Sequence, residues 1–413
     1  MQLNGFAAPS LSAIVCKTLA MKGAIAAVLL FAATGASALD VSHLSDDIQS
    51  AIASKEAAIE AGRKRQKYDF VGDFRLSGSA TQSKTVGAGD WSGSEQIGAS
   101  FSQDIFRSGG IIASIDYAEL SALSARLQLI QERNGHLQSL ATLLLQSKQD
   151  EIRLRQNELN AKNAEIALLI KQRQYEAGEA DITQLNDALQ TKNNLRKTRL
   201  DLENQRLSRL EDIAKLTPLK PEAIPLAPFE QIDQGEFVEN SISAKLAKVQ
   251  SQSAKVQQTI TVSSYLPSIS ASAGVSRSYA DTGDRESYNY GLSLSMPISL
   301  TEGWAIEEKK LEALRAQSQE RTTIEEVKRA YAQSKSAIET TQKNVEVSKE
   351  NIALYDSLIN VTRAQAQSGS VSLFDLQTLE NSRESDRLEI ESNQIAVQIE
   401  LAKLYYAIDK EIK

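Results

Sequence analysis

The chain has 413 residues, of which 41% are hydrophobic, 24% charged and only 5% aromatic, and its formal net charge is −7 at pH 7. This composition favours long exposed helices over one thick globular core, and the plentiful, periodic apolar residues exclude collagen-like and disordered chains. The acidic balance disfavours nucleic acid as a partner, because nucleic-acid binders carry basic faces.

Residues 1–38 have the features of an export signal. Two lysines precede an apolar run at residues 24–34, and the small residues that end at Ala38 favour cleavage before Leu39. The apolar run is shorter than the roughly 20 residues that span a bilayer, which disfavours a membrane anchor. Cleavage would remove two lysines and no acids, so the net charge would change from −7 to −9.

The single cysteine, Cys16, lies within this predicted signal, and the sequence leaves open whether Met1 or Met21 is the start. The exported chain would therefore have no thiol for a disulfide, a metal site or a nucleophile. His43 and His136 have no second ligand at metal spacing, and no catalytic or phosphate-binding motif occurs. We expect neither an enzyme nor a bound cofactor or metal.

The chain contains an internal tandem repeat. Residues 76–80 match residues 269–273 in their pattern of small and apolar side chains, and Gly178 aligns with Gly369. A repeat of this length predicts that the two halves of the chain have the same order of helices and strands.

Four prolines between Pro218 and Pro228 mark a segment that cannot be helical throughout. We predict a first repeat at residues 39–217, a proline-rich linker at 218–235 and a second repeat at 236–413.

Each repeat contains one predicted β-hairpin. Large apolar residues alternate with Ser, Gly and Asn over residues 288–298, and residues 269–275 and 97–105 show the same period of two. Loops at residues 86–93 and 280–286 are rich in Gly, Asp and Ser, as hairpin turns require.

Each hairpin is followed by a long helix. No proline occurs at residues 111–175 or 304–367, and apolar residues from Leu120 to Leu144 recur at coiled-coil spacing. Each run would reach about 95 Å if it were continuous.

Gly178 and Gly369 then indicate reversals, after which returning helices are predicted at residues 182–216 and 373–408. Shorter helices at residues 45–67 and 236–261 precede the strands.

A sheet with one apolar and one small polar face is a poor soluble design, because its edges stay open and little of the chain can cover the apolar face. The alternation is typical of a membrane barrel, apolar toward lipid and polar toward the lumen. Such a barrel must close, and known barrels start at about eight strands, so four strands per chain predict that subunits share one barrel. Two copies would give eight strands and three would give twelve.

The duplicated order of helix, hairpin, long helix, glycine turn and returning helix resembles the TolC-type outer membrane efflux protein family. The segments that support this resemblance are residues 265–273, residues 291–298 and the turns around Gly178 and Gly369. The resemblance implies a mainly α protein with two β-hairpins, which forms a homotrimer with a shared twelve-stranded barrel and a coiled-coil α-helical barrel in the periplasm. It further implies contact with outer membrane lipid, a periplasmic adaptor protein and an inner-membrane pump of the RND or ABC type.

Within this resemblance the two turns are candidate adaptor contacts. Gly178 and Gly369 would present bare backbone at the inner end of the tunnel, with Ile182 and Leu373 on the same surface. The alternative is that the glycines only terminate helices.

Asp375 lies where the family places an acidic ring at the inner entrance, and three copies around one axis would favour cations. The alternative is a solvated helix carboxylate. The acid that the family has three residues further on is Thr378 here, and the first repeat has Gln184 at the place of Asp375.

The sequence therefore predicts the passive outer membrane duct of a tripartite efflux or type I secretion system, with an exported coiled-coil structural protein or adhesin as the alternative. It does not reveal whether the cargo is a drug, a metal ion or a polypeptide.

Overall fold

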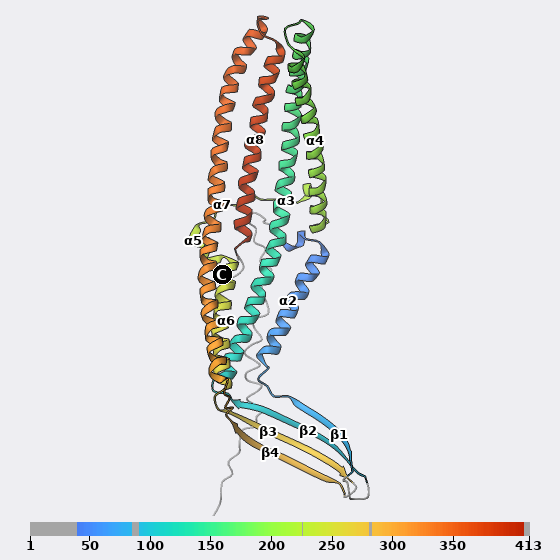
Figure 1. Cartoon of the computed structure of the whole chain (residues 1–413), viewed down its shortest axis with the longest axis vertical. Helices are drawn as coiled ribbons and strands as arrows, with labels where there is room; N and C mark the ends of the chain where they lie inside the picture. Colours follow the sequence, from blue (N-terminus) through green and yellow to red (C-terminus); the bar gives the residue numbers. More distant parts are fainter. Residues whose placement is uncertain (1–38, 85–90, 225, 281–282, 409–413) are drawn as a thin grey trace, which may run out of the picture. The chain divides into compact units, whose positions relative to one another are not determined.

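The computed structural model describes residues 39–84, 91–224, 226–280 and 283–408. The predicted signal at 1–38, Pro225 of the linker, and parts of both predicted hairpin loops lie outside these residues. The described chain is mostly helical, with one four-stranded sheet (Figure 1).

The first repeat has five main elements, which follow a 3-10 turn at Val41–His43: α2 (Asp46–Lys67), β1 (Phe74–Ser83), β2 (Ser92–Phe106), α3 (Gly110–Glu176) and α4 (Ile182–Leu216). The second has six, which follow a 3-10 turn at Pro221–Ala223: α5 (Gln234–Asn240), α6 (Ile242–Ser264), β3 (Ser268–Ala280), β4 (Arg285–Ser295), α7 (Glu302–Gln367) and α8 (Leu373–Tyr406).

Several predicted boundaries were wrong, including those of the hairpin loops, because β2 already begins at Ser92 and β4 at Arg285. The helix expected at residues 236–261 is two helices, because Ser241 has the non-helical angles φ −57° and ψ 125° and its side chain caps α6. The last strand ends at Ser295 rather than at residue 298, where Pro297 has no N–H to donate to a ladder. The last helix ends at Tyr406, two residues earlier than expected.

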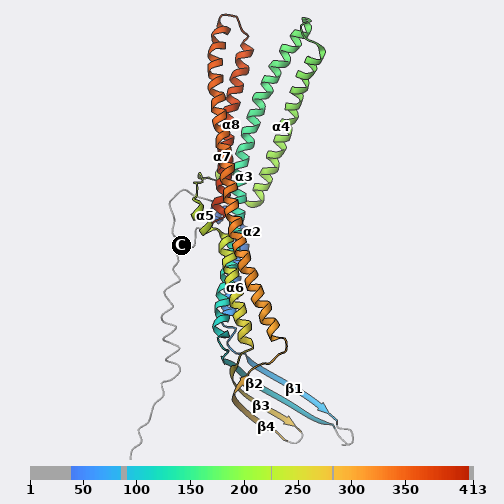
Figure 2. The same ribbon diagram turned by 60° about the vertical axis from the view of Figure 1, so that its left-hand side comes forward.

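The long helices pack as two antiparallel hairpins. Helix α3 packs on α4, α7 packs on α8, and α8 also lies along α3, which gives the side-by-side order α4, α3, α8, α7 (Figures 1 and 2). Both helix-to-helix turns therefore lie at one end, and both hairpins of the sheet connect to the other. The shorter helix α2 packs on α3, and α6 packs on both α3 and α7.

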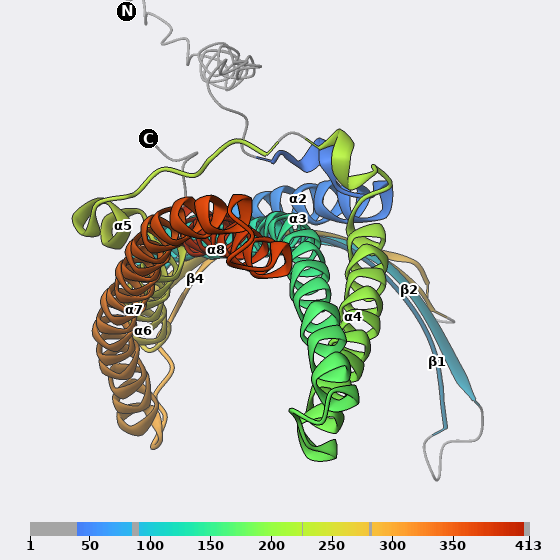
Figure 3. The ribbon, with the colours of Figure 1, turned by 90° about the horizontal axis from the view of Figure 1, so that it is seen from above.

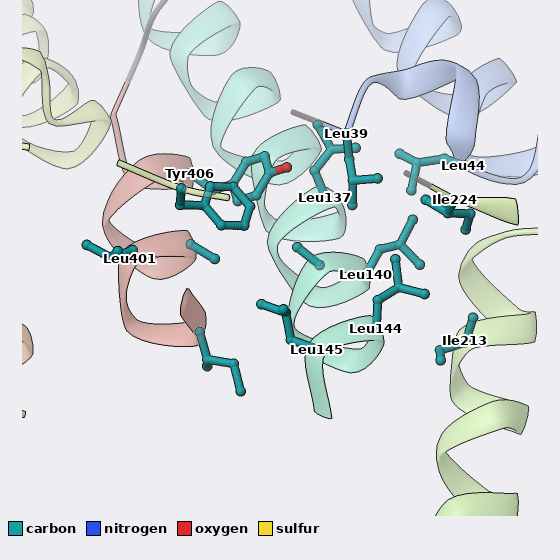
Figure 4. Close-up of a cluster of buried hydrophobic side chains, with 14 of the residues drawn as sticks. Leu39, Leu44, Leu137, Leu140, Leu144, Leu145, Ile213, Ile224, Leu401 and Tyr406 are labelled. Carbon is teal, nitrogen blue, oxygen red and sulfur yellow. The ribbon is translucent and has the colours of Figure 1, made fainter. Parts of the chain in front are cut away.

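The main apolar core lies where the two repeats meet, partway along the long helices. Leu137, Leu140 and Leu144 from α3 meet Leu401 and Tyr406 from α8 (Figure 4). The linker contributes to the same cluster through Ile224 and Phe229, which are both buried. The proline-rich segment is therefore part of the core and not a free tether.

A second apolar cluster is built around α7. Tyr331 is buried there, and its hydroxyl donates to the carbonyl of Ile232 at 2.8 Å. Among the described residues, no helix combines the length and the apolar character needed to cross a bilayer.

Candidate functional site: the two-faced sheet and the helical turns

All four strands form one antiparallel sheet in chain order. Strands β1 and β2 pair, as do β3 and β4, and β2 also pairs with β3. The two hairpins therefore join within one chain, which sequence periodicity could not reveal. Strands β1 and β4 form the two edges, and neither has a partner on its outer side in the described chain.

The register separates two faces. One row across the sheet runs Leu76, Ala99, Val275, Tyr288, and the next row on the same face runs Phe74, Phe101, Ala273, Tyr290. The row between them, on the opposite face, runs Arg75, Ser100, Gly274, Asn289. Alternation within each strand thus becomes a continuous apolar face and a continuous polar face.

Within the described residues, the apolar face is uncovered. Tyr290 is 90% exposed, and Leu76 and Leu292 are each 75% exposed. An exposed apolar patch of this kind marks a surface that meets lipid or protein.

The two helical turns have the same backbone. Gly178 and Gly369 adopt φ of +74° and +76°, in the left-handed region that favours glycine. In each turn the next residue closes a six-residue hydrogen-bonded loop, from Glu179 N to Gln174 O at 2.7 Å and from Ser370 N to Gln365 O at 2.9 Å. Both are Schellman motifs, so both glycines terminate their helices.

The returning helices start with side-chain caps and exposed apolar residues. Asp181 accepts a hydrogen bond from Gln184 N at 2.9 Å, and Ser372 accepts one from Phe374 N at 3.2 Å. Ile182 and Leu373, the first residues of α4 and α8, are 61% and 72% exposed. The candidate contact residues thus share one end of the helices and face solvent.

Asp375 lies in the first turn of α8 and is exposed. Its backbone N–H donates to Ser372 O at 3.1 Å, and its carboxylate forms no ion pair within the described residues. The position suits either a solvated carboxylate or one that meets its copies around an axis. In the described ranges, no group of three or more His, Cys, Asp or Glu side chains is placed to hold a metal.

A polar seam, not predicted from the sequence, joins the two helical hairpins. Gln149 and Gln156 of α3 donate to the carbonyls of Ser392 and Ser385 of α8, at 2.9 and 3.2 Å. Asn163 continues the series toward Thr378 O at 3.4 Å and accepts from Asn381 at 2.8 Å. The donors recur every seven residues on α3, and their acceptors every seven on α8, in opposite directions. The spacing of the amides can be read from the sequence. Only the packing of α3 on α8 shows that these amides donate to the carbonyls of the facing helix.

The outer helices of the row carry apolar stripes that no other part of the described chain covers. On α4 the exposed residues are Ile182, Leu189, Leu200 and Leu207. On α7 they include Val347, Leu354 and Val361, again seven residues apart. Viewed from above, α4 and α7 lie at the two ends of the helix row (Figure 3).

The fold and these surfaces place the protein in a structural class. Its members have two copies of a long helical hairpin and a four-stranded sheet that is apolar on one face. The chain matches the family described as "Outer membrane efflux protein" over residues 41–217 and 237–409. The chain therefore belongs to the outer membrane efflux protein family, which confirms the resemblance drawn from the sequence and assigns the protein to the bacterial outer membrane. Comparison with curated protein sequences finds no match.

Solved structures show the same fold at low sequence identity. The outer membrane protein VceC of Vibrio cholerae is 14% identical, with a TM-score of 0.72 over 88% of this chain and 93% of that one. The CmeC outer membrane channel of Campylobacter jejuni is 11% identical, with a TM-score of 0.70 over 90% and 86%. The open state of the MtrE outer membrane channel of Neisseria gonorrhoeae is 15% identical, with a TM-score of 0.66 over 89% and 86%.

Proposed function

We propose that the protein is the passive exit duct of a tripartite efflux or type I secretion system. The observation that carries this proposal is the sheet, whose apolar face is uncovered and whose two edges are unpaired within the described chain. Lipid covers such a face, and pairing between copies satisfies such edges.

Three copies close the structure. Four strands per chain give a twelve-stranded barrel in the outer membrane, with the Ser, Gly and Asn face toward the lumen. The apolar stripe on α4 of one copy packs on that of α7 in the next, so the helices form a periplasmic tunnel.

The inner end of the tunnel contacts a periplasmic adaptor, which links it to an inner-membrane pump of the RND or ABC type. The exposed apolar residues beside the two glycine turns support this contact. The duct is not an enzyme, and the pump supplies the energy for transport. Asp375 lines the inner entrance, where three copies favour cations.

The decisive experiment uses protein purified from the membrane fraction. We expect a trimer in detergent that migrates differently on gels before and after heating, and step conductance in planar bilayers. Asp375→Asn should form the same trimer but lose cation preference, because the charge of the entrance ring is removed. A monomer that needs no detergent would overturn the duct and favour the coiled-coil structural protein or adhesin; unchanged selectivity in the variant would overturn only the role of Asp375.

The adaptor contact is tested by Gly369→Asn. Asparagine tolerates the left-handed backbone. A Cβ atom at position 369 would have no other atom of the described chain within 4 Å. If bare backbone is needed for the adaptor, export of a test substrate should fall while trimer yield is unchanged. Gly135→Asn, at an exposed position of α3, is the matched control. Normal export by the Gly369 variant would leave the glycine as a helix terminator only.

A further inference from the structure

The segment that follows the predicted cleavage point is anchored in the core at both ends. Leu39 is 4% exposed and Leu44 is 1% exposed, although both belong to the chain's outermost described segment. Both side chains join the main apolar cluster, where they lie near Leu137 and Leu140 of α3 (Figure 4).

The backbone between these two leucines is fixed by hydrogen bonds. Asp40 caps the short 3-10 turn, with its carboxylate accepting from Val41 N at 2.7 Å and its own N–H donating to His43 Nδ1 at 3.2 Å. Ser45 N donates to Leu216 O at 2.8 Å, which ties the segment to the end of α4. The position of Leu39 therefore follows from a defined local structure.

Beside Leu39 lies a buried hydroxyl that lacks a hydrogen-bond partner among the described residues. Tyr406 is 5% exposed, and its oxygen points toward Leu39 and Leu137 (Figure 4). Burial raises the pKa of this hydroxyl, and the neighbouring Tyr405 raises it further, whereas the backbone N–H of Leu39 lowers it. Leu39 therefore lies beside a buried hydroxyl that no described residue satisfies.

We propose that signal-peptide removal creates a docking group: Leu39 becomes the N-terminal residue, its side chain fills the core, and its new α-amino group donates to the Tyr406 hydroxyl. The step is hydrolysis of the Ala38–Leu39 peptide bond by a signal peptidase, in which one water leaves a carboxylate on Ala38 and an amino group on Leu39. It precedes folding, because Leu39 is buried in the folded protein. The proposal rests on export, which is part of the proposed function.

Cleavage changes what the Leu39 nitrogen can do. Within a peptide bond it has one N–H in a fixed direction. A free amino group has up to three protons and rotates, so it can donate to a nearby acceptor that the fixed amide does not satisfy. Satisfying both buried groups matters because an unpaired buried polar atom is costly. Only a chain that begins at Leu39 would form this contact, since a chain that began at Asp40 would lack both the leucine and the amine beside Tyr406.

The first measurement is N-terminal sequencing of the purified full-length product, which should begin Leu39-Asp40-Val41. The second is amine labelling near neutral pH, followed by mass spectrometry of the N-terminal peptide. The α-amino group should react at least about tenfold more slowly in the native protein than in denaturant, because reaction requires local opening.

Two matched variants distinguish the loss of this contact from a general destabilisation of the core. Tyr406→Phe should speed labelling of the α-amino group several-fold. Tyr331→Phe removes a buried tyrosine hydroxyl elsewhere in the core, the one that donates to Ile232, and should not.

Another first residue, equal labelling in native and denatured protein, or equal effects of the two variants would overturn the proposal. These readouts do not depend on conductance or trimer formation, so failure of the duct would leave them interpretable.

Discussion

Asp386 of α8 has a carboxyl group that is only partly hydrogen-bonded in the folded chain. Its Oδ2 atom is buried without a hydrogen-bond partner among the described residues. Burial raises the pKa of this carboxyl, and the nearby Glu389 raises it further, against a hydrogen bond from Asn351 that lowers it. The charged form is therefore disfavoured by the fold.

A carboxyl whose pKa is higher in the folded than in the unfolded chain destabilises the fold when it is ionised, and stability recovers as the pH falls through the folded-state pKa. We expect Asp386→Asn to raise the apparent melting temperature near neutral pH. This advantage should shrink as the pH is lowered toward the ordinary value of 3.8. Thermal unfolding followed by circular dichroism at several pH values measures it, with Asp201→Asn, an exposed carboxylate on α4, as control. A gain that is independent of pH would contradict the assignment to ionisation.

Whole elements are held together by two kinds of contact. The sheet-side helices are linked by exposed ion pairs such as Lys55 with Glu132 at 2.7 Å, which contribute little individually. The seam between α3 and α8 instead uses amides that donate to backbone carbonyls. An amide must face a carbonyl to be satisfied, so a slip of one helix along the other is penalised, and the seam fixes the relative heights of the two glycine turns.

The seam predicts a position-dependent cost for glutamine truncation. Gln149 is 8% exposed and donates to Ser392 O, so Gln149→Ala should lower the free energy of unfolding by about 1 kcal/mol through the lost hydrogen bond. Gln131→Ala, at an exposed position on the same helix, should change it by less than about 0.5 kcal/mol. Denaturant unfolding of the two purified variants gives the comparison. Equal effects would mean that the seam contributes no specific stability.

At the scale of the molecule, the described chain leaves three kinds of surface uncovered: the apolar sheet face, the edges of β1 and β4, and the stripes on α4 and α7. Lipid suits the first of these. Copies of the same chain suit the other two. Each copy has both a β1 edge and a β4 edge, and both an α4 stripe and an α7 stripe, so neighbouring copies can pair them.

Cross-linking tests whether β1 of one copy meets β4 of the next. No cysteine follows residue 38, so Ser77→Cys can be combined in turn with cysteine at Ser287, Asn289 or Ser293 of β4. At least one pair should give covalent trimers on oxidation in membranes.

The matched pair Ser102→Cys and Ser272→Cys joins residues that lie opposite each other on β2 and β3, so it should cross-link only within one chain. Monomers from every β1–β4 pair would contradict barrel closure by this contact.

Sequence periodicity alone determined the two hairpins, the long helices and the glycine turns, because each depends on residues close together in the chain. Alternation every two residues and the absence of proline are local constraints. The returning helix at residues 182–216 was predicted with the bounds that the structure has.

Tertiary structure decided everything that depends on which distant segments meet. The pairing of β2 with β3, the amide seam between the repeats, and the burial of Leu39 beside Tyr406 join residues that are 163 to 367 positions apart, and no local pattern encodes such a pairing. From the sequence alone, nothing distinguishes the leucine that follows the predicted signal from other leucines; its burial depends on the helices that enclose it.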